Sequence, residues 1–227
     1  MVEVDNMSIS GRDPLKAEIS SDTLLTGLAP SLSRQPRPPD SAAAAPPLSS
    51  EAVRILASTA PLPPPRRKLL EGLALLWHDH WEDAHSIAQS REDAINASEP
   101  HSDSLTEDAI NASEPHSDSL TEGQADYDLL HAMVHRREGD YPNADYWFRA
   151  AGRHPSHALL ELAISKSPPD GLPSLPSLLP GGRWSPKVFS AEVRRVAGAA
   201  RSEKETEILI RLQALEFRAF SDWLLSA

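Results

Sequence analysis

The chain has 227 residues, 21 prolines and a net charge of −11, and hydrophobic residues make up 40% of it. So many prolines exclude regular structure over part of the chain, while the apolar fraction suits one helical core better than a large two-layer α/β domain. The negative charge argues against nucleic acid as the main partner, because a phosphate-binding surface needs clustered lysines and arginines.

The sequence contains no cysteine, which excludes a disulfide framework, a thiol nucleophile and a cysteine-ligated zinc site. The acidic start, Met1 to Asn6, does not resemble a basic and apolar leader, and no stretch is apolar enough to span a bilayer. These features predict an intracellular protein, cytoplasmic or nuclear, that is neither secreted nor membrane-bound.

Residues 1–50 are rich in serine, proline and alanine and show no sustained apolar period. Such a segment buries too little surface to offset its ordering entropy, so we expect a disordered tail. The helical domain is then expected over residues 51–227, beginning with a short helix over Glu51 to Ser58.

Two helical hairpins are predicted next. Leucines and a tryptophan at helical spacing predict a helix over Arg66 to His78, and a second helix begins at Trp81. A third is predicted over residues 126–137, ended by Gly139, and a fourth opens at Pro142, where proline is tolerated as a first helical residue.

An acidic insertion separates these hairpins. The segment 92–106 is repeated without change as 107–121, and residues 91–125 hold nine acidic residues against Arg91, which supplies −8 of the net charge. The repeat lacks the apolar face that stacked repeats need, so a solvated acidic insertion is predicted. Without the two copies, Trp81 and Tyr141 would be 30 rather than 60 positions apart, close to one helical hairpin.

The C-terminal part is predicted to hold three more helices. A short one occupies 156–165, and a proline-rich loop follows over residues 167–184. Ser185 and Pro186 are typical of an N-cap and a first helical residue. A strongly amphipathic helix starting near Ser202 is expected to lie across the earlier pairs and seal their exposed end.

The segment Gly139-Asp140-Tyr141, followed by Ala144, Phe148 and Ala151, resembles the second half of a tetratricopeptide repeat. The preceding half fits less well, with Ala132 and His135 where the motif favours small and aromatic residues. The resemblance implies an all-α, tetratricopeptide-like fold of antiparallel helical hairpins.

A closer resemblance rests on WHDHW at 77–81 and HxxxHRREGDY at 131–141. Both motifs are similar to those of an uncharacterised helical family of fungi and bacteria, over most of residues 66–227. The tail and the duplicated segment lie outside the match. Since the family has no assigned activity, the resemblance implies a fold and no mechanism.

Five histidines lie in these two motifs and just after the first. His131 and His135 are four apart, so both project from one side of a helix, a spacing that permits shared binding of one divalent metal. His78 or His80 is expected to complete a three-nitrogen site, and His85 is the fifth. The carboxylate candidates, as ligand or base, are Glu82, Asp83 and Glu138. The alternative is that these imidazoles fill helix interfaces.

The midchain aromatics gather around the same histidines, which favours a concave face that holds a protein or peptide partner. The candidate binding residues are Trp77, Trp81, Arg136, Arg137, Tyr141, Asn143, Tyr146 and Trp147. The alternative places Trp81 and Trp147 in the core and Arg136, Arg137 and Glu138 at a solvated helix end.

The first functional hypothesis is thus a protein-interaction or scaffolding module. The second is a metal-binding protein or metal-assisted hydrolase, and whether the chain is an enzyme is left open.

Overall fold

The computed structural model describes residues 20–27, 29–32, 47–98, 123–166, 178–198 and 203–226, and within these ranges every regular element is a helix. The predicted all-α class is therefore confirmed. The α-helices are α1 (Ser21–Leu24), α2 (Ser50–Ser58), α3 (Pro64–Trp77), α4 (Trp81–Ser98), α5 (Gln124–Glu138), α6 (Tyr141–Ala151), α7 (Ser156–Lys166), α9 (Pro186–Gly198) and α10 (Glu203–Leu225). A 3₁₀ turn, η2 (Pro180–Gly182), precedes α9. None of the described helices combines the length and apolar character that crossing a bilayer requires.

The hairpins α3–α4 and α5–α6 have matching turns. In each, an N–H reaches back to the carbonyl five residues earlier, from His80 to Leu75 and from Asp140 to His135. The residue before each donor has a left-handed backbone conformation: Asp79 has φ 67° and Gly139 has φ 86°. These turns lie 60 positions apart, the offset that the sequence predicts, while the assignment to tetratricopeptide repeats stays a prediction.

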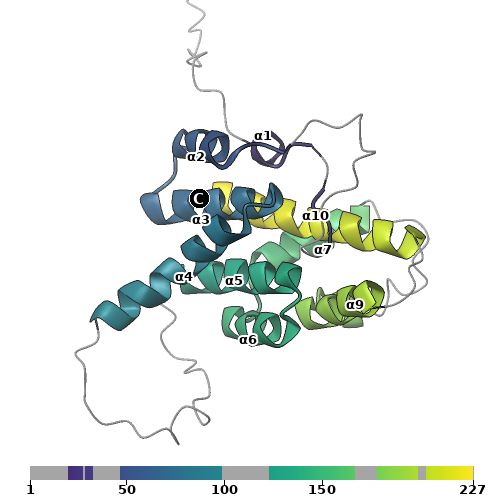
Figure 1. Ribbon diagram of the computed structural model, residues 1–227. Coiled ribbons are helices and arrows are strands. Elements are labelled where there is room, and N and C mark those ends of the chain that lie inside the picture. The colour runs from purple at the N-terminus through teal and green to yellow at the C-terminus, as the bar shows by residue number, and fades with distance from the viewer. Residues whose placement is uncertain are drawn as a thin grey trace, which may run out of the picture.

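The hairpins pack closely through Gly72 on α3. A Cβ there would lie 2.8 Å from Leu130 Cδ2 and 2.9 Å from Ile87 Cγ2, so a larger residue fits only if these side chains or their helices shift. Helix α10 then crosses the molecule (Figure 1). Its first half joins a core with α7 and α9, and its second half packs through Phe217 and Phe220 into the core around α3.

Arg136 is completely buried at the end of α5, with 0% of its surface exposed. Its guanidinium binds the Glu216 carboxylate on α10 through two hydrogen bonds, one of them 3.2 Å long between Nη1 and Oε1, and lies 4.8 Å from the Phe189 ring centroid. The prediction that Arg136 lies at a solvated helix end is therefore wrong. Arg136 ties α5 to α9 and α10.

Arg137 is also 0% exposed. It donates to Asp79 Oδ1 at 2.7 Å and to the Leu76 carbonyl, and its guanidinium lies 4.1 Å from the ring centroid of Trp81. A third hydrogen bond of 3.3 Å reaches the Ser31 carbonyl. Arg137 therefore joins the end of α5 to the turn between α3 and α4.

Part of the predicted tail belongs to the core. Leu24, Leu25 and Leu32 are buried, and Trp77 Nε1 donates to the Thr26 carbonyl at 2.9 Å. The prediction of disorder is wrong for residues 20–27 and 29–32, because apolar residues spaced too irregularly for a helical pattern still fill gaps between helices. Residues 1–19, 28 and 33–46 lie outside the described part.

The predicted acidic insertion, 91–125, and the predicted loop, 167–184, both overlap residues that the structure describes as ordered parts of the fold. Residues 91–98 continue α4, and α5 already begins at Gln124, so only 99–122 remain of the predicted insertion, outside the described residues. In the predicted loop 167–184, Leu178 and Trp184 are buried, and the Trp184 N–H donates to Glu161 Oε1 at 2.6 Å. Residues 167–177 lie outside the described part.

The pair Arg136–Glu216 yields a first prediction. Glu216→Ala should destabilise the fold by roughly 3–5 kcal/mol, because it leaves a buried guanidinium unpaired. The double variant Arg136→Met/Glu216→Leu should recover most of that loss. Glu192→Ala, which breaks an exposed pair with Arg195, is the control and should cost under about 1 kcal/mol. Urea unfolding measures all three, and equal losses in Glu216→Ala and Glu192→Ala would contradict the role of the buried pair.

The N-terminal segment yields a second prediction. Leu24→Ala should lower the free energy of unfolding by about 2–5 kcal/mol, since Leu24 is wholly buried. Leu162→Ala serves as the matched control, because that side chain is 50% exposed and the variant should lose less than about 1 kcal/mol. Thermal and urea unfolding report the difference. If Leu24→Ala changes nothing, residues 20–32 are not packed on the core.

Candidate metal centre

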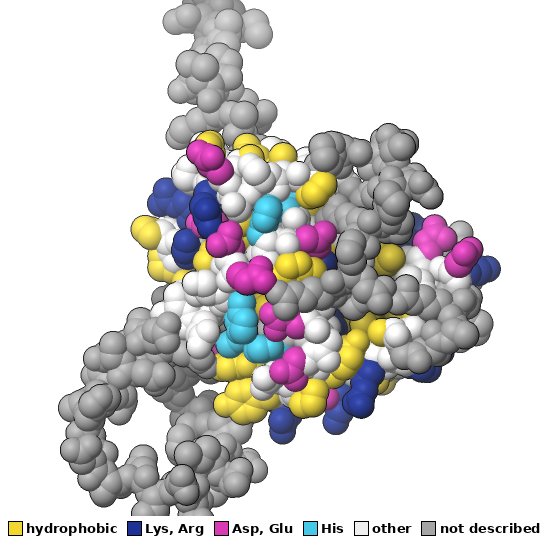
Figure 2. Space-filling view, in the orientation of Figure 1, with side chains coloured by type: hydrophobic (Ala, Val, Ile, Leu, Met, Phe, Trp, Pro, Cys, Tyr) yellow, Lys and Arg dark blue, Asp and Glu magenta, His cyan; other side chains and the backbone are white. Residues whose placement is uncertain are grey.

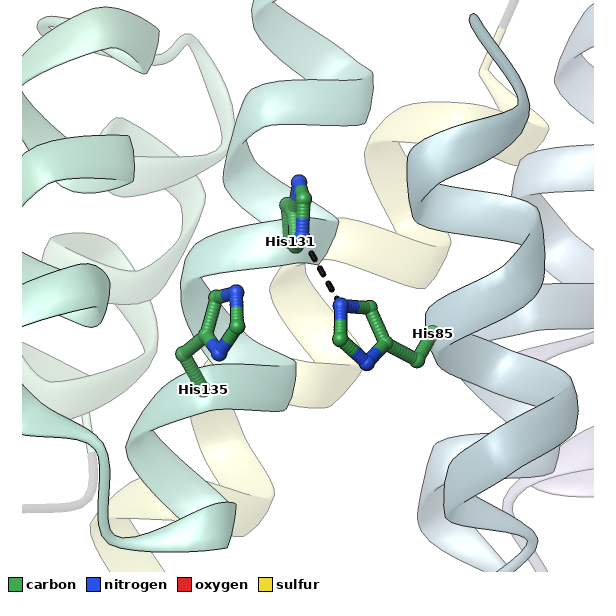
Figure 3. Close-up of side chains that lie close together, drawn as sticks. All are labelled: His85, His131 and His135. Carbon is green, nitrogen blue, oxygen red and sulfur yellow. Dashed lines mark hydrogen bonds between the residues drawn. The ribbon is translucent and has the colours of Figure 1, made fainter. Parts of the chain in front are cut away.

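Three imidazoles converge where α4 and α5 pack together. His131 and His135 stack on α5 with ring centroids 4.7 Å apart, and His85 faces them from α4 (Figure 3). The Nε2 atoms of His85 and His131 are 3.1 Å apart. One ligating nitrogen from each ring lies within 4.8 Å of the other two, the only such group of potential metal ligands among the described residues.

The position of His85 follows from the contacts of Arg137. That guanidinium covers Trp81, the first residue of α4, so it fixes the start of α4 against the last turn of α5. His85 comes one helical turn after Trp81, on the same side of α4. This contact therefore helps to place one imidazole from α4 opposite two from α5.

The carboxylate of Glu138 lies beside the Nδ1 atoms of His85 and His135. One of its carboxylate oxygens is 3.2 Å from His135 Nδ1 and the other is 3.7 Å from His85 Nδ1, although the angle at His135 is not that of a regular hydrogen bond. A carboxylate beside Nδ1 favours the tautomer with hydrogen on Nδ1. The Nε2 lone pairs of both rings are then directed to the centre of the cluster.

Burial favours the uncharged form of His131 and His135. Desolvation is the main cause that lowers the pKa of His131 to about 3, and the neighbouring His135 and His85 lower it further. Burial also lowers the pKa of His135, against the opposing effect of Glu138. Only neutral imidazole ligates a metal, so protons compete weakly for these nitrogens.

One side of the cluster reaches the surface. His85 keeps 31% of its side chain exposed, and Figure 2 shows histidine side chains at the surface in the region of α4 and α5, with acidic side chains beside them. Trp147 stacks on His131 with ring centroids 4.3 Å apart and shields it. An ion could therefore enter past His85 without crossing the core.

The structure brings the predicted ligands His131 and His135 together, but the third imidazole is His85 and not His78 or His80. The ring of His78 accepts from the Leu48 N–H at Nδ1 and donates from Nε2 to the Leu24 carbonyl. His80 donates to the Leu48 carbonyl at 2.8 Å. Both rings hold the N-terminal segment in place, which the sequence gave no means of foreseeing.

Of the three carboxylates predicted as ligand or base, the structure places only Glu138 beside the histidine cluster. Asp83 pairs with Arg54 on α2 at 2.9 Å, and Glu82 is exposed. Glu138 is the one of the three that contacts the histidines.

The eight predicted binding residues do not form one exposed face. Trp77, Trp81, Arg136 and Arg137 are buried, so they are not available to a partner, and their prediction as binding residues is wrong. The other four belong to α6. Tyr141 and Trp147 are partly buried, Asn143 is exposed and bonds to Asp140, and Tyr146 is 55% exposed. A protein partner on this smaller face stays a prediction.

A second polar cluster lies inside the protein. His154 bonds to Asp126 Oδ1 at 2.6 Å and to Ser156 Oγ at 2.7 Å, and Trp223 donates to the same Asp126 oxygen. Desolvation by itself raises the pKa of Asp126, but the hydrogen bonds from His154 and Trp223, together with the nearby positive charge, lower it overall. The order Ser, His and Asp resembles a catalytic triad, but all three side chains are buried. We interpret the cluster as a structural link between α5, α7 and α10.

Comparisons with protein families, with curated proteins and with solved structures find no match to this chain. The resemblances to tetratricopeptide repeats and to the family with the WHDHW motif therefore stay predictions.

The burial of His131 yields a third prediction. In metal-free protein, its ring NMR signals should stay constant from pH 7.5 to 4.5, assigned by their loss in His131→Asn. The unfolded chain takes up this proton near pH 6.5 and the folded protein only near pH 3, so His131 makes stability fall as pH decreases from 6.5 towards 3. A midpoint near pH 6.5 would show that His131 is solvated.

Proposed function

We propose that this protein binds a divalent transition metal, with zinc as the preferred ion, through His85, His131 and His135. The observation that carries the proposal is the convergence of three imidazole rings from two helices, within 4.8 Å at their ligating nitrogens. Imidazole ligands suit zinc, copper, nickel and iron rather than magnesium or calcium.

The distances are close to those of a bound ion. With Zn–N bonds of about 2.0–2.1 Å and tetrahedral angles, two ligating nitrogens lie roughly 3.4 Å apart. His85 and His131 are already at 3.1 Å. Their Nε2 atoms can share only one proton, and a metal would replace that hydrogen bond. The widest separation in the group, up to 4.8 Å, has to shorten by roughly 1.4 Å, which rotation of a side chain supplies.

Glu138 supports metal binding better than hydrolysis. A carboxylate that contacts the Nδ1 side of ligating histidines orients them and raises their basicity. A general base for hydrolysis would instead face the water bound at the fourth position of the metal, on the Nε2 side. Since Glu138 lies on the Nδ1 side of both His85 and His135, the geometry favours a metal-binding function over a metal-assisted hydrolase.

The fourth prediction concerns metal content. Purified protein should hold zinc in a one-to-one ratio by elemental analysis, and its cobalt form should show the visible absorption of a tetrahedral site. His85→Ala, His131→Ala and His135→Ala should each lose the metal. Glu138→Gln should keep it with an affinity roughly 10–100 times lower, because the rings lose their orienting carboxylate.

His80→Gln is the matched control, since that histidine lies one turn from His85 and bonds to the backbone of Leu48. It should lose stability and retain zinc. Lack of zinc binding by the wild type in calorimetric titration would refute the proposal. So would retention of zinc by all three alanine variants, and the histidines would then be helix-packing residues only.

A further inference from the structure

A cavity of about 520 Å³ lies between α6, α7 and the start of α9, separate from the histidine cluster. Three of its residues lie on one side of α6, at positions 145, 148 and 149, and Gly152 follows the end of that helix. Trp147 of the same helix stacks on His131. The remaining lining residues are Arg153, His157, Arg183, Trp184, Ser185, Pro186 and Lys187. The volume falls within the range of sites for small organic ligands.

The cavity is positively charged although the protein is acidic. Arg149, Arg153, Arg183 and Lys187 line it, against Asp145 as the one acidic lining residue. Arg153 is neutralised by Glu161, whose carboxylate it binds at 3.0 Å. Arg183 and Lys187 have no ion-pair partner among the described residues. After these pairings the lining keeps an excess of two positive charges.

The floor of the cavity is aromatic. Phe148 and Trp184 are buried and belong to its wall, so a flat apolar group has two rings to pack against. The wall also holds three buried polar atoms without a hydrogen-bond partner in the described part: Asp145 Oδ1, His157 Nε2 and Trp184 Nε1. Neighbouring atoms cover them, so the charge and shape of the cavity carry the inference.

The start of α9 adds to the positive potential. Ser185 caps this helix by accepting from the Val188 N–H at 3.4 Å, and Ser185, Pro186 and Lys187 all line the cavity. The first turn of a helix carries a partial positive charge from its free N–H groups. An anion in the cavity would be attracted by this helix end as well as by the side chains.

From these features we infer that the cavity binds a small organic phosphate, a phosphate monoester attached to a flat ring. A phosphate monoester is close to a dianion at neutral pH, which matches the excess of two positive charges better than a single carboxylate does. Guanidinium groups bind phosphate through paired hydrogen bonds. The ring would pack against Phe148 and Trp184. The inference does not depend on the metal proposal, because none of the three histidines lines the cavity.

The fifth prediction uses phenyl phosphate as the probe, with binding followed by ligand-observed NMR and by calorimetry. Wild-type protein should bind it with a Kd below about 1 mM, the range of weak specific ligands. Benzyl alcohol, which has the ring without the charge, should bind at least tenfold more weakly. Inorganic phosphate, which has the charge without the ring, should also be at least tenfold weaker.

Arg183→Ala/Lys187→Ala should weaken phenyl phosphate binding at least tenfold, because it removes two positive charges from the cavity. Both side chains are exposed, so the fold should be kept. Lys166→Ala is the matched control, an exposed cation of α7 outside the cavity, and should stay within twofold of wild type. Unchanged binding by the double variant, or none by wild type at about 5 mM probe, would overturn the inference. Equal affinities for inorganic and phenyl phosphate would refute the role of the aromatic floor. Zinc content, measured in parallel, should be the same in every variant.

Discussion

The buried guanidinium of Arg137 is the contact on which the arrangement of the two hairpins depends. It binds the turn before α4, covers the first residue of α4 and reaches the N-terminal segment, while its backbone belongs to the last turn of α5. A buried charge is tolerated only when its hydrogen bonds are satisfied, so the surrounding groups must keep fixed positions. The relative placement of α4 and α5, and hence of three imidazoles, follows from that requirement.

The sequence predicts much of the helical framework because its signals are local. Leucine spacing, Gly139 and Pro142 indicate α3, α5 and α6 to within a few residues, and the offset of 60 positions between the hairpins agrees with their matching turns. The burial of Arg136 and Arg137 is not local. Two arginines beside a glutamate at a helix end are typical of solvated surface, and only the folded structure brings Glu216 and Asp79 to them.

The candidate site was predictable in part for the same reason. The spacing of His131 and His135 is a property of one helix, so the pair could be found in the sequence. The third imidazole depends on which residue of another helix faces them. His78, His80 and His85 are equivalent in sequence, but the first two lie at the turn and point to residues 24 and 48, which the sequence assigns to a tail. Because the predicted tail packs on the core, it binds His78 and His80 and leaves His85 as the third imidazole.

Helix α6 gives the two proposed sites a physical connection. Trp147 shields His131 on one of its faces, while Phe148 and Arg149 line the basic cavity on another. Ala144 of this helix is wholly buried in the core, and the left-handed turn at Gly139 precedes the helix. A ligand that shifted α6 would alter the packing of Trp147 against His131, whereas a metal held by α4 and α5 would make those helices more rigid without contacting the cavity. Because coupling of two sites requires a shared element with two positions, α6 is the helix through which any such effect would act.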